Sequence, residues 1–119
     1  MSPAVEDHAL ARIVTDAPQH RSVRVALRYD PADDPQTVRF AFPRGSASDR
    51  EWAFPRELLE TGLRYPARHG DVGIWPCGRV QTVLEFHTPD GVAVVQFDAK
   101  ALIRFLRHTY AVAAPATRR

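Results

Sequence analysis

The chain has 119 residues, 45% of them hydrophobic and 25% charged, which is typical of a folded globular protein and excludes a disordered one. This length predicts one domain, because domains cluster near ~100–150 residues. The net charge is +2, and all the basic residues except Lys100 and the histidines are arginine. An arginine-, alanine- and proline-rich composition indicates a GC-rich genome, so the arginines alone are weak evidence for phosphate binding.

Neither a membrane span nor an export signal is predicted. No apolar run approaches the ~20 residues that cross a bilayer, and the N-terminal sequence lacks the basic start and hydrophobic block of a secretory signal. Cys77 is the only cysteine, which excludes an internal disulfide. We therefore expect a cytoplasmic protein.

The first half of the chain shows the alternation of strands. After a frayed start, apolar and polar residues alternate with a period of two, with Trp52 and Phe54 on the inward side of the last run. Pro31 and Pro35 bracket a turn between two of the runs. The predicted strands are Ala9–Thr15, Val23–Tyr29, Val38–Phe42 and Glu51–Phe54.

A short helix follows the fourth predicted strand. Pro55 suits its first turn, where a missing N–H costs nothing, and Gly62 suits its C-terminal cap. Leucines in this helix, at Leu58, Leu59 and Leu63, would pack it against the sheet.

The second half predicts three more strands and a closing helix. His69–Asp71 is expected to be a turn, and Pro76 is expected to stop the strand before it. Thr88–Gly91 has the composition of a hairpin turn. Asp98 is expected to cap the helix, whose apolar positions run from Leu102 to Tyr110. The predicted strands are Val72–Trp75, Val80–His87 and Val92–Phe97, and the residues from Ala113 onward are expected to form a loose tail.

These elements predict an α+β fold of antiparallel sheets in the order ββββαβββα. Short hairpin connections imply antiparallel pairing, with both helices on one face. We expect a single domain over residues 1–119, ordered from about 8 to 112.

No catalytic or metal-binding constellation emerges from the sequence. The five histidines lack the spacing of a metal pair, and zinc needs three or four converging ligands. Nothing places a base beside Cys77 to generate a thiolate, although a thiol enzyme built on Cys77 and a histidine stays open as an alternative. Prolines interrupt the acidic run Asp30–Asp34, which favours turn formation over calcium binding. We therefore expect no enzymatic activity and no metal or cofactor.

Two surface features are candidates for binding. Arg24, Arg28 and Arg39 share the non-core face of adjacent predicted strands and could line a groove for single-stranded nucleic acid. The aromatic residues of those strands point inward, so a solvated sheet face is the competing interpretation. Trp75 lies on a possible edge strand and is either a core residue or an anchor at a protein interface.

Four blocks of sequence resemble one family. They are LRYDPADDPQTVRFAF, EWAFPRELLETGL, GDVGIWP and ALIRFLRHTYAV. Their order and spacing are similar to those of the SsgA-like proteins of sporulating actinomycetes, over roughly His8 to Val112. The LRYD-P-x-D-P turn and the W-x-F-x-R-x-L-L-x-x-G block are specific in combination.

The resemblance implies a regulator of sporulation and cell division rather than an enzyme. Its expected partners are the tubulin-like division protein FtsZ and other SsgA-like proteins, and its expected location is the division septum. It also implies a Whirly-like fold, related to single-stranded nucleic-acid binders, and a homo-oligomer, with a trimer favoured. Nucleic-acid binding through the arginine face stays the alternative function. No residue of the partner surface carries over from the family.

Overall fold

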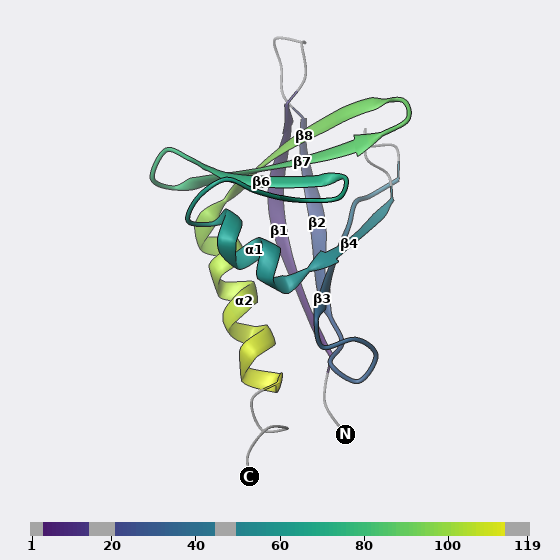
Figure 1. Ribbon diagram of the computed structural model, residues 1–119, viewed down its shortest axis with the longest axis vertical. Coiled ribbons are helices and arrows are strands. Elements are labelled where there is room, and N and C mark those ends of the chain that lie inside the picture. Colours follow the sequence, from purple (N-terminus) through teal and green to yellow (C-terminus); the bar gives the residue numbers. More distant parts are fainter. Residues whose placement is uncertain (1–3, 15–20, 45–49, 114–119) are drawn as a thin grey trace.

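The computed structural model describes residues 4–14, 21–44 and 50–113, which form eight strands and two helices. The strands belong to one antiparallel sheet, and the two helices lie on the same side of the long β1–β2 hairpin (Figure 1). The elements are β1 Val5–Val14, β2 Arg21–Tyr29, β3 Thr37–Ala41, β4 Glu51–Pro55, α1 Arg56–Gly62, β5 Ala67–His69, β6 Val72–Cys77, β7 Gln81–Thr88, β8 Gly91–Asp98 and α2 Ala99–Ala113.

The strand order is β4-β3-β2-β1-β8-β7-β6-β5, so β1 and β8 join the two halves of the sheet. β1 pairs with β2 from Val5↔Tyr29 to Ile13↔Arg21, and its C-terminal part, Ala11–Val14, also pairs with β8. In Figure 1 the β6–β8 strands cross the β1–β2 strands at a steep angle. β4 and β5 are the edges of the sheet, and each pairs with only one neighbour.

The predicted alternation places one face of every long strand in a single core. Phe40 lies at its centre and makes edge-to-face contacts with Phe54, Phe97 and Phe105, at 5.1, 5.6 and 6.2 Å between ring centroids. Trp52 points inward as predicted and stacks on Phe86 at 4.7 Å. Edge-to-face and offset stacking add to the burial of the rings, so these pairs fix how α2 and both halves of the sheet meet.

The α+β class and the antiparallel pairing are confirmed, but the strand count is wrong. A fourth strand of the second half, β5 (Ala67–His69), occupies part of the segment expected to be a turn. Three residues between Pro66 and Gly70 are too few to show alternation. The sheet is also continuous, because β1 pairs with β8 as well as β2.

Several strand boundaries also differ from the prediction. β1 begins at Val5, where a frayed end was expected, because Val5–Ile13 pairs with β2. β6 continues through Pro76 to Cys77. β5 pairs with β6 only along Val72–Ile74, so no strand lies beside Pro76 on that side. Pro76 is tolerated because the N–H that it lacks would face this open side rather than β7. β7 begins at Gln81, and Val80 is exposed. Thr15 and the loops predicted at Ala17–His20 and Gly45–Asp49, like the tail beyond Ala113, lie outside the described residues.

The ends of α1 differ from the prediction. Pro55 is the N-cap in an extended conformation, and Leu63 is the C-cap. Gly62 is the last helical residue, with no positive φ. Its role is close packing, since a Cβ on Gly62 would lie 2.3 Å from Cγ2 of the buried Ile74. The glycine therefore lets α1 approach β6.

α2 is capped and anchored at both ends. The Asp98 carboxylate accepts the backbone N–H of Lys100 at 3.3 Å, as predicted for a cap. Leu102, Phe105, Leu106 and Thr109 are buried, whereas Tyr110 is 41% exposed. Near the other end, His108 Nδ1 lies 2.7 Å from Asp7 Oδ2 on β1. Within the described ranges, neither helix is long and apolar enough to cross a membrane.

Candidate functional site

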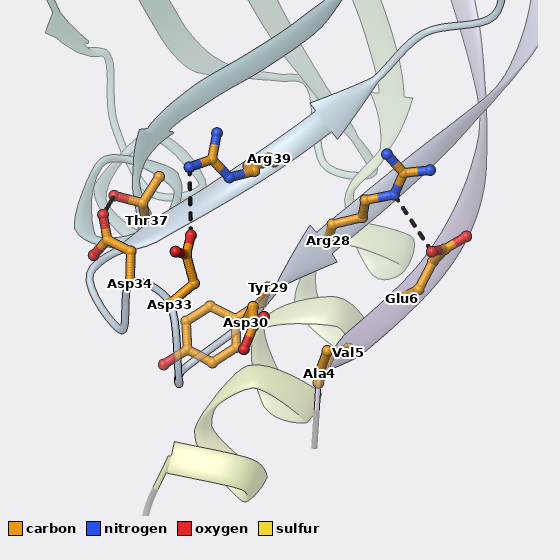
Figure 2. Close-up of a pocket in the computed structure, with 10 residues that line it drawn as sticks. All are labelled: Ala4, Val5, Glu6, Arg28, Tyr29, Asp30, Asp33, Asp34, Thr37 and Arg39. Carbon is orange, nitrogen blue, oxygen red and sulfur yellow. Dashed lines mark hydrogen bonds and ion pairs between the residues drawn. The ribbon is translucent and has the colours of Figure 1, made fainter. Parts of the chain in front are cut away.

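A cavity of about 270 Å³ opens where β1, β2 and β3 meet the loop between β2 and β3. Figure 2 shows Asp33 of this loop beside Arg39 of β3, and Glu6 of β1 beside Arg28 of β2. Its charged lining consists of four carboxylates and two guanidinium groups, so the cavity is acidic on balance. The lining residues are Ala4, Val5, Glu6, Arg28, Tyr29, Asp30, Asp33, Asp34, Thr37 and Arg39.

Two of the three arginines predicted to bind nucleic acid lie in this cavity. Arg28 and Arg39 are cross-strand partners on the outward face. Arg28 contacts Glu6 through Nε at 3.4 Å and Glu51 through Nη1 at 3.2 Å. Arg39 lies 3.8 Å from both Asp33 and Glu51. Acidic and basic groups therefore alternate along this series of ion pairs, and we call its members the charge ladder: Glu6, Arg28, Glu51, Arg39 and Asp33.

The loop beside the charge ladder is held by its own carboxylates. Asp34 accepts hydrogen bonds from Thr37 Oγ1 at 2.8 Å and from the backbone N–H of Gln36 at 3.0 Å. The hydrogen bond from Thr37 has the largest effect, and together the two bonds hold the pKa of Asp34 below its usual value. Asp30 caps the turn through the backbone N–H of Ala32 at 3.0 Å. The acidic run thus forms a turn, as the sequence predicted.

Arg24, the third predicted arginine, is separate from the charge ladder. It lies on β2 opposite Leu10 of β1. Arg24 has no ion-pair partner among residues 4–14, 21–44 and 50–113. The structure therefore does not bring the three arginines into one basic groove.

Trp75 lies on the outward face of β6, opposite Val83 of β7, and is half-buried. β6 is not the edge strand that the sequence suggested, because β5 pairs along Val72–Ile74. Trp75 is beyond the end of that pairing. It belongs to neither the buried core nor the fully exposed surface, so its proposed role at a protein interface stays a prediction.

Reactive side chains that the sequence singled out occupy separate places. Cys77 is exposed, and its polar contact is the Gln96 amide at 4.0 Å, which cannot serve as a base.

On the outward face, the Glu85 carboxylate accepts a hydrogen bond from Arg68 Nη2 at 2.7 Å and lies 2.8 Å from His87 Nε2. Both contacts lower the pKa of Glu85, and the hydrogen bond from Arg68 has the larger effect. In the described part of the chain, no three His, Cys, Asp or Glu side chains converge on a possible metal position.

An exposed patch on the outward face of β1 and β2 was not predicted as a site. Leu10 is 72% exposed and Val14 40%. Arg12, between them on β1, is exposed and has no ion pair within the described segments. The sequence carried a signal, since Leu10 and Val14 are apolar residues in the polar phase of the strand. We call Leu10, Arg12, Val14 and Arg24 the β1–β2 patch.

Comparison with known families decides the relationship. A family model described as "Streptomyces sporulation and cell division protein, SsgA" matches residues 23–117. The chain belongs to the SsgA family. The sporulation-specific cell division protein SsgB of Salinispora tropica is 42% identical to this SsgA-family chain, covering 92% of it and 80% of the relative. SsgB of Streptomyces coelicolor is 35% identical, with 98% and 87% covered.

Solved structures agree with the SsgA-family assignment. One, described by "Mutations in SsgB correlate to longitudinal cell division during sporulation of Streptomyces coelicolor", has a TM-score of 0.85 at 35% identity and covers 98% of this chain and 92% of its own. An SsgA-like sporulation-specific cell division protein from Thermobifida fusca YX-ER1 has a TM-score of 0.82 at 29% identity, with 95% and 85% covered. The predicted resemblance to SsgA-like proteins is confirmed, and the similarity extends to proteins named SsgB.

Proposed function

We propose that this protein regulates sporulation-specific cell division without catalysis, by helping to position FtsZ at septation sites through direct protein contact. The observation that carries the proposal is the similarity to proteins named SsgB, which extends over 92–98% of the chain. In this proposal the protein is cytoplasmic and acts at the division septum. It forms a single domain that offers surface rather than reactive groups.

The placement of the polar groups supports an adaptor. His108 bridges α2 to β1 through Asp7, and His87 and Arg68 share the Glu85 carboxylate. These contacts join neighbouring elements, so the groups serve the fold. Cys77 lies beside an amide rather than a base. Binding to a protein requires none of these groups to react.

A homo-oligomer, favoured as a trimer with a Whirly-like arrangement, belongs to the same proposal. The sheet has two edges, β4 and β5, that pair on one side only. Exposed edges are sites where another chain can add, and self-association would cover one of them. Several copies of one weak site, held in a ring, would bind a filament with avidity.

The charge ladder weighs against the alternative of a single-stranded nucleic-acid binder. Phosphate binding depends on cationic groups that exchange counterions for phosphates. Arg28 and Arg39 face three carboxylates instead, and the aromatic rings of β2 and β3 point into the core. A protein partner is therefore the better match.

The proposal is tested by sedimenting the purified protein with FtsZ from the same organism. With GTP-polymerised FtsZ, we expect the protein in the pellet in proportion to polymer, and with GDP-bound FtsZ much less. A septal signal from a fluorescent fusion during sporulation is expected as well. Light scattering should give a mass above the 13.4 kDa of one chain.

Two results would count against the proposal. A protein that stays in the supernatant at every FtsZ concentration does not bind the filament. A clean monomer at micromolar concentration removes the assembly on which avidity depends. Tight, salt-sensitive binding of an oligonucleotide without FtsZ binding would favour the alternative function.

A further inference from the structure

The outward face of the β1–β2 hairpin divides into two regions of different charge. Near the loop between β2 and β3, the charge ladder pairs each arginine with carboxylates. Toward the other end of the hairpin, the β1–β2 patch has two arginines with no such partner among the described residues. Arg12 and Arg24 therefore form a basic patch with no ion pair to the described part of the chain.

An exposed leucine lies between those charges. Leu10 is the cross-strand partner of Arg24, which sets their Cβ atoms about 5 Å apart. Arg12 follows two residues along the same face of β1, about 7 Å away. Leu10 is the most exposed of the large hydrophobic side chains on the described surface, at 72%. A complementary partner therefore needs an apolar side chain with carboxylates beside it.

The surroundings favour a protein over a nucleic acid as that partner. A nucleic-acid platform needs aromatic faces for stacking. The aromatic residue in the same cross-strand row is Trp75, and the row runs from Trp75 through Val83 and Gln96 to Arg12. Three strand spacings separate its ends, about 14 Å. Leucine offers no stacking face, but it suits an apolar side chain.

We propose that the β1–β2 patch is the docking site for an acidic segment of the partner protein, in which an apolar side chain contacts Leu10 while carboxylates pair with Arg12 and Arg24. This inference rests on the proposed function, and it names the surface and the chemistry of that contact. Opposite charges steer the encounter and fix the register, and the leucine contact slows dissociation. The acidic segment would thus cover the exposed outward face of β1 and β2.

The test measures binding to polymerised FtsZ from the same organism over a range of salt concentrations. Arg12→Glu/Arg24→Glu is expected to weaken binding about tenfold or more and to remove most of its salt dependence. Leu10→Ser is expected to weaken binding several-fold while keeping the salt dependence of wild type. The matched control is Arg104→Glu, on the exposed side of α2, which is expected to bind like wild type.

Circular dichroism and thermal unfolding check that each variant folds, and Arg12→Ala/Arg24→Ala replaces the charge reversal if that variant does not. If wild type binds FtsZ and the patch variants bind equally well, the docking site is wrong and the proposed function stands. If wild type does not bind FtsZ, the proposed function fails and the docking site falls with it. Loss of oligothymidine binding, rather than FtsZ binding, in the arginine variants would overturn the inference in favour of nucleic acid.

Discussion

The guanidinium carbon of Arg56 lies 3.8 Å from the centroid of the Tyr110 ring. The same carbon is 5.1 Å from the ring of Tyr29, and Nη1 donates to Thr109 Oγ1 at 3.4 Å. Tyr110 in turn donates its hydroxyl to Glu60 of α1. Arg56 is the first residue of α1, so a single side chain joins α1, α2 and β2.

Replacing this link should destabilise the protein. We expect Arg56→Ala to lower the free energy of unfolding by about 1–2 kcal/mol, since partly desolvated cation–π and hydrogen-bond contacts are both lost. The free energy of unfolding of Arg56→Lys should lie between those of wild type and Arg56→Ala, because lysine keeps the charge but not the planar group that stacks. Urea denaturation measures the difference, with the exposed Arg107→Ala as control. An Arg56→Ala variant as stable as wild type would show that the rings pack equally well without it.

Gly62 sets the distance between α1 and β6. We expect Gly62→Ala to lower the free energy of unfolding by about 1–3 kcal/mol, because the new Cβ overlaps Ile74, which is fully buried. Gly73→Ala is the matched control. Its Cβ would meet the Arg68 guanidinium at 3.0 Å, the far end of a flexible side chain that can move. Thermal unfolding of both variants should rank Gly62→Ala well below Gly73→Ala, and equal losses would contradict the close-packing role.

Glu85 gives the protein a pH-dependent contribution to stability. Its pKa lies below the ordinary value of 4.5 because Arg68, and then His87, hydrogen-bond to the charged form. A lowered folded-state pKa stabilises the fold above the unfolded value, and this gain is lost as the pH falls through the folded-state value. Arg68→Met should therefore raise the pKa of Glu85, measured by NMR titration of its side-chain carboxyl.

The same substitution should change the pH profile of stability. The difference in stability between wild type and Arg68→Met should be largest above about pH 4.5 and should shrink as the pH falls. Arg104→Met, on the exposed side of α2, serves as the control and should keep the wild-type profile. A difference that stays constant down to low pH would mean that Arg68 stabilises by packing over Gly73 rather than through Glu85.

The sequence was sufficient for the elements whose pattern is long and regular. Alternation over β2, β3 and β7 identifies the buried side of each strand, and the apolar positions of α2 identify its packed face. β5 could not be predicted, because its pairing with Val72–Ile74 comes from the neighbouring strand rather than from its own three residues. For the same reason, the sequence predicts that Pro76 ends the strand. Because β5 does not pair with β6 beyond Ile74, the missing N–H of Pro76 breaks no strand pairing.

The candidate sites show a similar limit. Side-chain phase predicted that Arg24, Arg28 and Arg39 share one face, which is correct. It could not show that Glu51, 12 or more positions away along the chain, faces two of them from β4, since that contact depends on strand order. The β1–β2 patch was visible as apolar residues in a polar phase, but only the exposed fraction of Leu10 separates a docking surface from a covered one.

Cys77 offers a direct test of the proposal that the protein acts without catalysis. We expect Cys77→Ser to retain wild-type FtsZ binding and wild-type sporulation, because the thiol is exposed and lies beside the Gln96 amide. Complementation of a deletion strain measures sporulation, and co-sedimentation measures binding. A variant that binds FtsZ but fails to restore sporulation would reveal a role for the thiol.

Glu51 offers the sharpest test of the alternative function. Its carboxylate lies 3.2 Å from Arg28 and 3.8 Å from Arg39, so it opposes the approach of phosphate to both. We expect wild type to bind oligothymidine weakly, and Arg28→Ala/Arg39→Ala to leave that binding unchanged. Glu51→Gln should strengthen it several-fold with a steeper salt dependence, since two guanidinium groups lose their shared counter-charge.

The control for that experiment is Glu57→Gln, which removes the same charge from α1, away from the charge ladder. Fluorescence anisotropy over a salt series separates the two variants, because a general change in net charge would affect both equally. Strong wild-type binding that disappears in Arg28→Ala/Arg39→Ala would mean that phosphate displaces the carboxylates, and the arginine face would then be a nucleic-acid site. Binding that increases only in Glu51→Gln would instead identify the charge ladder as the feature that keeps phosphate from this face.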